Sequence, residues 1–274
     1  MCCGTVIYFV YTQKKTSTAP YGQLRHQMLA LFFVILTANN VCIWLNGAVE
    51  AERPSWTRLW NVAKKRYCTD GGANRIVGRE PELAPPDVVI GDMDSILNVV
   101  ADGLRRRCLL VHAPDQDKTD LTKCLEYIAE DFKKDLQLGF LFHTSEASRV
   151  LLLGGTSGRF DHSLAAINSL YYSTKIMDKD VYCLDGENLT CVLDEGEHII
   201  QVDRKHVTGT CGVVPFCQRP TVVTMKGFRW DLEDTKMSFG GIVSTSNFME
   251  KDVLTVKTSA PLIFTMELVA ASLL

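Results

Sequence analysis

The sequence lacks any Cys-x-x-Cys pair, although it contains ten cysteines. Closely spaced cysteine pairs are typical of zinc sites, and small secreted domains use cysteines as disulfide frameworks. Here the cysteines are scattered, and several lie inside apolar runs such as Tyr182-Cys183-Leu184. We therefore interpret them as reduced, buried side chains and expect a cytoplasmic protein without a zinc site.

Basic side chains are not concentrated anywhere in the chain. No run of Lys and Arg is longer than Arg105-Arg106-Arg107, and the formal net charge is −3. Nucleic acid is therefore not an expected partner, since its phosphates need a basic field. The 274 residues, of which 46% are hydrophobic, are enough for one large domain or two ordinary ones with buried cores.

Long apolar runs are also scarce. Residues Met28 to Val49 carry no charge, but three asparagines interrupt them, at positions 39, 40 and 46. A membrane-spanning helix needs about 20 predominantly apolar residues. We therefore predict a buried first strand at Phe32 to Leu36, with a signal or anchor segment as the less favoured alternative. Residues 1–28 before it show no strong periodicity, and we expect a poorly ordered extension.

Short apolar strands alternate with helical patterns through the first two thirds of the chain. Strands are predicted at 67–69, 87–90, 109–112 and 149–153, and helices at 55–65, after Asp120 and at 163–173. Beyond about Asp178, β-branched or alternating segments follow one another without a helical stripe. The expected fold class is α/β: a parallel-sheet, Rossmann-like domain over 29–177, followed by an all-β sandwich domain over 178–274.

Two acidic loops follow consecutive predicted strands. Asp92 and Asp94 come after the first strand, and Asp115, Asp117 and Asp120 come after the second. Carboxylates packed together repel one another unless a cation is present, and oxygen ligands with little nitrogen or sulfur nearby suit Mg²⁺ better than zinc. The alternative is two solvated acidic turns, and Asp120 could simply favour the dipole of the helix that it begins.

Glycine-rich loops follow two further strands. Asp70-Gly71-Gly72 is the first, and Gly154 to His162 is the second. Glycines after a strand let the backbone approach a ligand, although a plain tight turn uses them equally well. Because ligands of open α/β sheets bind at the carboxyl ends of the strands, four such loops at one edge predict a metal-held phosphate ligand.

Five motifs, in this order, closely resemble those of the eukaryotic thiamine pyrophosphokinases: Asp70–Arg75, Gly91–Ser95, Asp115–Asp120, Gly154–Asp161, and Trp230 with Ser244–Asn247. The resemblance runs from about Phe32 to the carboxyl terminus. The sequence departs from the family pattern in two places: the extension before Phe32, and the segment between Val41 and Pro54, which looks longer than the family's usual link from the first strand to the first helix. The resemblance implies transfer of the pyrophosphoryl group of ATP to the thiamine hydroxyl, and a homodimer with active sites between subunits.

The resemblance also implies roles for individual residues. Mg²⁺ and the triphosphate would be held by Asp70, Asp92, Asp94 and Asp120. Catalysis would involve three of these, Asp92, Asp94 and Asp120, together with Arg159 and Asp161. Gln116, Asp117 and the loop around Arg159 would contact the nucleotide, whereas Asp161, Trp230, Ser246 and Asn247 would help to hold thiamine. The other expected substrate-binding positions are Gly71, Gly72, Asn74, Arg75, Lys118, Thr119, Gly155 and Ser244.

Other interpretations stay open on the sequence alone. Trp230 could be a core side chain instead of an aromatic platform for the cationic thiazolium. The Asp-x-Asp motif is also used by metal-dependent glycosyltransferases, which would leave Asp115 to Asp120 without a role. A non-catalytic thiamine or nucleotide binder, or a membrane-tethered interaction protein, would release no AMP when thiamine is added.

Overall fold

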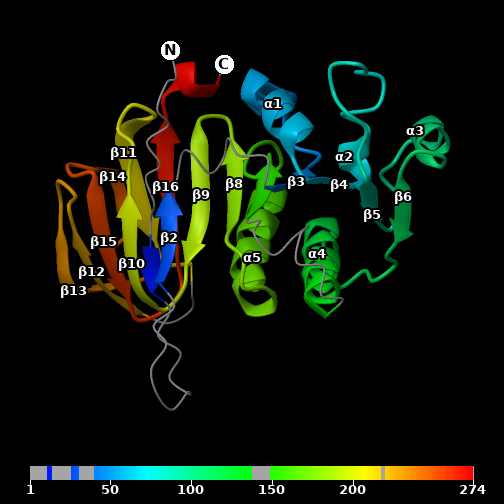
Figure 1. Cartoon of the computed structure of the whole chain (residues 1–274). Coiled ribbons are helices and arrows are strands. Elements are labelled where there is room, and N and C mark those ends of the chain that lie inside the picture. The colour runs from blue at the N-terminus through cyan, green and yellow to red at the C-terminus, as the bar shows by residue number, and fades with distance from the viewer. Residues whose placement is uncertain (1–10, 14–25, 31–39, 138–148, 217–219, 274) are drawn as a thin grey trace. The chain divides into compact units, whose positions relative to one another are not determined.

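The computed structural model describes residues 11–13, 26–30, 40–137, 149–216 and 220–273 (Figure 1). The chain divides into two compact units. The α/β unit comprises Thr37–Leu189 and Ala270–Leu274, and the β unit comprises Met1–Leu36 and Thr190–Val269. The predicted strand at Phe32 to Leu36 lies outside the described residues.

The α/β unit is built on a parallel sheet with the strand order β8-β7-β3-β4-β5-β6. Its strands are β3 (Val41–Trp44), β4 (Lys65–Thr69), β5 (Val88–Gly91), β6 (Leu109–His112), β7 (Val150–Leu153) and β8 (Val181–Asp185). The chain runs from β3 outward to β6 and then returns to the other side of β3 with β7 and β8. The strand order therefore reverses between β3 and β7, and a crevice at such a reversal is where open α/β sheets bind their ligands.

Strand β3 explains why the segment between Val41 and Pro54 looked too long. Val41 to Trp44 are all buried, and β3 pairs in parallel with both β4 and β7. The inner strand of the sheet is therefore part of this segment. The sequence prediction selected the longer apolar run upstream, because a short buried strand and a longer apolar run cannot be ranked by hydrophobicity alone.

The helices of this unit are α1 (Pro54–Val62), α2 (Asp70–Ala73), α3 (Asn98–Leu104), α4 (Asp120–Gln137) and α5 (Phe160–Ile176), with the short 3-10 turns η1 (Val49–Ala51) and η2 (Ala270–Leu273). Helices α4 and α5 pack side by side (Figure 1), and the hydroxyls of Thr122 and Ser169 lie 2.9 Å apart between them. Cys124, Leu125 and Ile128, from the apolar stripe of α4, are fully buried. The helix is thereby fixed with its first residue, Asp120, at the carboxyl edge of the sheet.

The β unit contains two sheets. One has the order β1-β2-β10-β15-β12-β13, and the other includes β14-β11-β16-β9. The strands are β1 (Tyr11–Gln13), β2 (His26–Ala30), β9 (Asn188–Leu193), β10 (Gly196–Gln201), β11 (Val207–Val214), β12 (Thr221–Lys226), β13 (Leu232–Met237), β14 (Ser244–Phe248), β15 (Val253–Thr258) and β16 (Leu262–Leu268). Phe228 and Phe264 meet edge to face in its core, with ring centroids 6.4 Å apart. The expected fold class, a parallel α/β sheet followed by an antiparallel sandwich, is confirmed.

Two local features were not predicted from the sequence. Strand β14 begins at Ser244, and Ile242, shortly before it, is exposed. Strand β8 continues the parallel sheet beyond residue 177. The domain limits at 28/29 and 177/178 stay predictions. Among the helices that are described, none combines the length and the apolar character needed to span a bilayer.

Candidate active site

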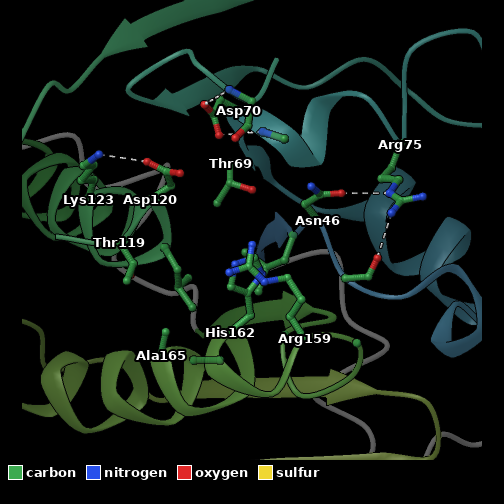
Figure 2. A pocket seen from close by; sticks show the side chains of 18 of the residues that line it. Asn46, Thr69, Asp70, Arg75, Thr119, Asp120, Lys123, Arg159, His162 and Ala165 are labelled. Carbon is green, nitrogen blue, oxygen red and sulfur yellow. Dashed lines mark hydrogen bonds and ion pairs between the residues drawn. The ribbon is translucent and has the colours of Figure 1, made fainter. Parts of the chain in front are cut away.

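A pocket of about 620 Å³ lies at the carboxyl edge of the parallel sheet (Figure 2). Its lining comes from the loops after β3, β4, β5, β6 and β7 and from the starts of α4 and α5. Leu45 to Ala48 and Gly155 to Arg159 contribute from the two sides of the strand-order reversal. The four predicted loops therefore leave the sheet at one edge, and the loop after β3 is a fifth.

Three carboxylates meet at this edge. Asp70, Asp92 and Asp94 each offer one oxygen, and these oxygens lie within 4.8 Å of one another. Asp70 is held by the backbone amides of Gly71, at 2.6 Å, and Ser95, at 3.3 Å. A cluster of oxygen ligands held by backbone amides is what a hard divalent cation requires.

The backbone of the first acidic loop brings Asp92 and Asp94 together. Met93, between them, has a φ of 67°, which non-glycine residues rarely adopt. The Asp94 amide donates to a carboxylate oxygen of Asp92 at 3.2 Å, and Gln116 donates to the other oxygen at 2.9 Å. A strained residue between two acids, held by hydrogen bonds on both sides, is typical of a functional site.

Gly91 makes room for the Asp70 carboxyl group. A Cβ atom at Gly91 would lie 2.6 Å from Cγ of Asp70, which is closer than real Cβ contacts come. Burial, followed by the charge of Asp120, raises the pKa of Asp70 to about 6. In contrast, the hydrogen bond from Gln116, followed by that from the Asp94 amide, lowers the pKa of Asp92. The cluster therefore joins one carboxyl group that resists ionisation with one that is readily ionised.

Asp120 faces a buried lysine that the sequence analysis did not select. The side chain of Lys123 is 4% exposed, and its ammonium lies 3.0 Å from Asp120 and 3.7 Å from Asp92 (Figure 2). Burial opposes the charge of Lys123, but the hydrogen bond to Asp120 and the charge of that carboxylate raise the pKa of the lysine overall. The spacing of three residues between Asp120 and Lys123 on α4 was the available signal.

Asp115 and Asp117, the other acids of the third motif, lie apart from this cluster. Both are exposed, and the Asp117 amide donates to the Asp115 carboxylate at 2.9 Å, as in a capped turn. Lys118 lines the pocket and also pairs with Glu126 of α4, at 3.0 Å. The structure thus separates the five acids of the two loops into members of the pocket edge and members of a surface turn.

The motif Asp70–Arg75 contributes to packing as well as to the lining of the pocket. Gly71 and Arg75 line the pocket, but a Cβ atom at Gly72 would lie 2.3 Å from the Trp44 carbonyl oxygen. Asn74 ties the next loop in place, because its amide donates to the Ser95 carbonyl at 2.8 Å and its oxygen accepts from the Leu97 amide at 3.0 Å. Glycine at 72 and asparagine at 74 are therefore explained by packing.

Asn46 is a pocket residue that the sequence analysis did not assign. Its side-chain oxygen accepts from Nε of Arg75 at 3.1 Å (Figure 2), and the same guanidinium donates to the Gly47 carbonyl at 3.2 Å. The signal was Asn46-Gly47 directly after an apolar strand. It was overlooked because strand β3 was not predicted.

Arg159, at the end of the loop after β7, and Asp161, in the first turn of α5, form an exposed pair. Their charged groups lie 2.6 Å apart, and the hydrogen bond from Arg159 lowers the pKa of Asp161. Arg159 and His162 line the pocket, and Thr119 and Gly155 do as well. The loop therefore places one guanidinium, restrained by one carboxylate, at the pocket.

In the β unit, the predicted thiamine residues lie on two neighbouring segments: Trp230 on the turn before β13, and Ser244, Ser246 and Asn247 on strand β14. Trp230 is 56% exposed, so the alternative that it is a core side chain is wrong. Asn247 is 2% exposed; its oxygen accepts from the amides of Trp230 and Phe248, and its amide donates to the Trp230 carbonyl and the Ser244 hydroxyl. Ser246 is exposed with a φ of 55°. Asn247 thus fixes the backbone that presents the Trp230 ring.

Two family models match the chain. One is described as the thiamin pyrophosphokinase catalytic domain and matches residues 56–182, and the other is described as the thiamin pyrophosphokinase vitamin B1 binding domain and matches residues 197–263. Thiamin pyrophosphokinase 1 of Caenorhabditis elegans is 35% identical over 231 residues, which cover 84% of this chain and 89% of that protein. Thiamine pyrophosphokinase 1 of Oryza sativa subsp. japonica is 34% identical over 226 residues, which cover 77% of this chain and 81% of that protein.

Solved structures share the fold. The thiamin pyrophosphokinase of Candida albicans matches with a TM-score of 0.73 at 20% identity, over 96% of this chain and 99% of that chain. The yeast thiamin pyrophosphokinase matches with a TM-score of 0.71 at 24% identity, over 86% of this chain and 88% of that chain. At these identities the likeness concerns the architecture.

Proposed function

The chain belongs to the thiamin pyrophosphokinase family, and on that premise we propose that its carboxyl-edge pocket binds ATP with Mg²⁺. The reaction is transfer of the pyrophosphoryl group of ATP to the hydroxyl of thiamine, which gives thiamine diphosphate and AMP. The observation that carries the proposal is the meeting of Asp70, Asp92 and Asp94 within 4.8 Å at the strand-order reversal. A metal-dependent glycosyltransferase or a non-catalytic binder is not favoured.

The residues of the cluster fit Mg²⁺. Their donors are carboxylate oxygens, two of them on one restrained turn, and Asp70 is buried where a bound cation would favour its ionised form. Asp120 stands beside the three, bonded to Lys123, and is the fourth proposed ligand. When bound, Mg²⁺ would supply charge neutralisation to the phosphate oxygens.

The chain itself supplies positive charge around the pocket. In the reaction, the thiamine hydroxyl oxygen bonds to the β-phosphorus of ATP and releases its proton to solvent. The bond from that phosphorus to the oxygen bridging the α- and β-phosphates breaks, and AMP leaves with the electron pair. Lys123, Arg75 and Arg159 line the pocket and can stabilise negative charge on the phosphates. Asp161 is proposed to orient the attacking hydroxyl, with Arg159 holding the carboxylate ionised.

Thiamine recognition is proposed for the loop around Trp230. An exposed indole face attracts a cationic ring, and the backbone of Trp230 is clamped by Asn247. The Arg229 guanidinium already lies 5.7 Å from the Trp230 ring centroid, so the ring is accessible to a cation. Ser244 and Ser246, on the adjacent strand β14, complete the proposed thiamine site.

A homodimer is also proposed, on the family resemblance and on exposed apolar side chains of the β unit. Phe239 is 67% exposed, and Ile242 is 56% exposed. Large exposed apolar groups on a folded chain often mark association surfaces. Sedimentation of the purified chain tests this, and a monomer at micromolar concentration would contradict it. The cytoplasmic location stays a prediction from the thiol pattern.

The activity is tested by measuring AMP release from ATP with and without thiamine. The expected result is AMP formation that requires thiamine and Mg²⁺ together, with thiamine diphosphate formed in equal amount. Calorimetry with thiamine and a nonhydrolysable ATP analogue separates a binder from an enzyme. Binding of both ligands without AMP release would contradict the proposed function.

A further inference from the structure

Asp185, the last residue of β8, is a buried acid outside the five motifs. It is 3% exposed. Burying a carboxylate is costly unless it is paired or hydrogen-bonded, so its hydrogen-bond partners show what it does. Those partners all lie on the glycine-rich loop that follows β7.

Three donors of this loop converge on Asp185. The Thr156 amide donates to Oδ2 at 2.6 Å, the Thr156 hydroxyl donates to the same oxygen at 3.1 Å, and the Ser157 hydroxyl donates to Oδ1 at 2.9 Å. Hydrogen bonds to an ionised acceptor are stronger than those between neutral groups. One carboxylate therefore binds both the backbone and the side chains of the loop.

The loop needs such a restraint because its glycines are permissive. Gly154, Gly155 and Gly158 have φ values of 89°, 122° and 88°. Glycine loses more conformational freedom on ordering than other residues do, so a loop of this composition is ordered only by bonds from outside it. The Gly154 amide is bonded to the Leu184 carbonyl at 2.9 Å, and the Ser163 hydroxyl donates to the Thr156 carbonyl at 3.0 Å. Asp185 holds the Thr156 amide and the side chains of Thr156 and Ser157.

Asp185 lies behind the loop, away from the ATP pocket. It lines a second pocket of about 290 Å³ together with Thr156 and Ser157. Ser157 also lines the larger pocket, with Gly155 and Arg159. The loop thus forms the wall between the two pockets, and Asp185 can reach a ligand in the larger one only through that wall.

We propose that Asp185 is a positioning residue for ATP: it fixes the loop of residues 154–158 in the conformation that presents Gly155 and Arg159 to the triphosphate. This inference rests on the proposed ATP site. It gives Asp185, a residue of β8 outside the five motifs, a role in the affinity for the nucleotide. The alternative is that Asp185 stabilises the fold without affecting the pocket.

The test compares variants that differ in the hydrogen bonds that residue 185 can form with Thr156 and Ser157. Asp185→Ala removes all three hydrogen bonds and is expected to raise the KM for ATP about 10-fold or more, with the KM for thiamine changed less than about twofold. Asp185→Asn is expected to restore most of the affinity, because its oxygen can still accept from Thr156 while its amide donates to the Ser157 hydroxyl. Recovery by asparagine would show that bond geometry, rather than charge, carries the effect.

Asp131 provides the matched control. This partly buried acid accepts from the Tyr67 hydroxyl at 2.8 Å and pairs with Lys65 at 2.6 Å, where β4 begins, and so lies at the opposite edge of the sheet. Asp131→Ala is expected to lower the thermal midpoint and leave the KM for ATP unchanged. If Asp185→Ala behaves in the same way as Asp131→Ala, the inference is overturned.

Two further measurements keep the test decisive. If Asp185→Ala does not fold, the double variant T156V/S157A removes two of the three bonds and is expected to raise the KM for ATP about threefold; an unchanged KM in that folded variant would contradict the inference. Hydrogen exchange of the Thr156 amide should be protected in the wild-type chain and fast in Asp185→Ala, without any need for turnover. A wild-type chain that releases no AMP but binds an ATP analogue would refute the proposed function alone, and the affinity of Asp185→Ala for that analogue would then decide the inference.

Discussion

The acidic edge of the α/β unit and the Trp230 loop of the β unit obtain their geometry in different ways. Asp70 and Asp92 each follow the end of a parallel strand, so the sheet itself brings them together. Trp230 is presented by the turn between β12 and β13, where the Arg229 amide donates to the Phe248 carbonyl at 2.8 Å and the buried side chain of Asn247 bonds both backbone groups of Trp230. The first site is distributed over several strands, whereas the second rests on contacts between one turn and β14. Substitutions should therefore affect catalysis at the first site and affinity at the second, with a loss of stability where a contact of the turn is removed.

The largest effect is expected for the acids themselves. Asp92→Asn should lower turnover by about 1,000-fold or more, because several kcal/mol of charge stabilisation depend on the metal. AMP release at saturating ATP and Mg²⁺ measures it, with the unfolding midpoint as a check on the fold. Asp115→Asn is the control, since Asp115 lies on the exposed turn. Turnover retained by Asp92→Asn would remove the metal assignment.

A large effect is also expected at Gly91, because the absence of a side chain there makes room for the Asp70 carboxyl group. Gly91→Ala should displace the Asp70 carboxyl group, because the added Cβ would lie 2.6 Å from its Cγ atom. We expect about a 100-fold loss of kcat/KM for ATP, because a displaced Asp70 carboxylate would no longer be positioned to hold the metal. Gly103→Ala, in α3 with nothing within 4 Å of the added atom, should leave activity unchanged. Equal activity of the two alanine variants would show that the packing of Asp70 does not matter.

Lys123 tests whether the acidic edge needs an internal cation. Lys123→Met keeps the length of the side chain and removes the charge that faces Asp120 and Asp92. Turnover is expected to fall by about 10- to 100-fold, as for other charge-stabilising groups. Lys123→Arg should recover part of the loss. A methionine variant with wild-type turnover would assign the lysine to structure alone.

In the β unit the expected effects are smaller and divide between affinity and stability. Trp230→Ala should raise the KM for thiamine by about 10-fold, as for a lost cation–π contact with its buried area, and leave the unfolding midpoint unchanged because the ring is exposed. Asn247→Ala should raise the same KM and also lower the midpoint, because it leaves buried backbone groups unpaired. Identical unfolding midpoints in the two variants would contradict the claim that Asn247 holds the backbone of Trp230.

The smallest effect is the pH dependence of the metal-free chain. The pKa of Asp70 in the folded chain is raised to about 6, so the folded state binds the proton more tightly than the unfolded state does. The contribution of this group to the free energy of unfolding is therefore fully present below about pH 4 and is lost as the pH rises through about 6. Urea unfolding between these limits, compared with Asp70→Asn, should show the loss only in the wild-type chain. If the stability of the wild-type chain and of Asp70→Asn changed with pH in the same way, the raised pKa of Asp70 would be contradicted.

The sequence predicts the acidic edge better than the aromatic loop for a physical reason. The spacing of strand, loop and helix is local, so the order of motifs was enough to place Asp70, Asp92 and Asp94 on one edge. The exposure of Trp230 depends on a partner seventeen residues away, Asn247, and could not be read from the chain. Lys123 and Asp185 were missed because each acts through a contact that exists only after packing. Strand β3 was not predicted because a longer apolar run upstream gave the stronger signal.

The central claim is that Asp70, Asp92 and Asp94 share a divalent cation that holds the triphosphate of ATP. Anomalous diffraction from crystals soaked in Mn²⁺ and a nonhydrolysable ATP analogue tests it most directly. The account predicts a manganese peak within about 2.5 Å of an oxygen from each of the three acids, with the phosphates beside it. Clear density for the nucleotide with no metal at these oxygens, or a metal held elsewhere in the chain, would contradict it.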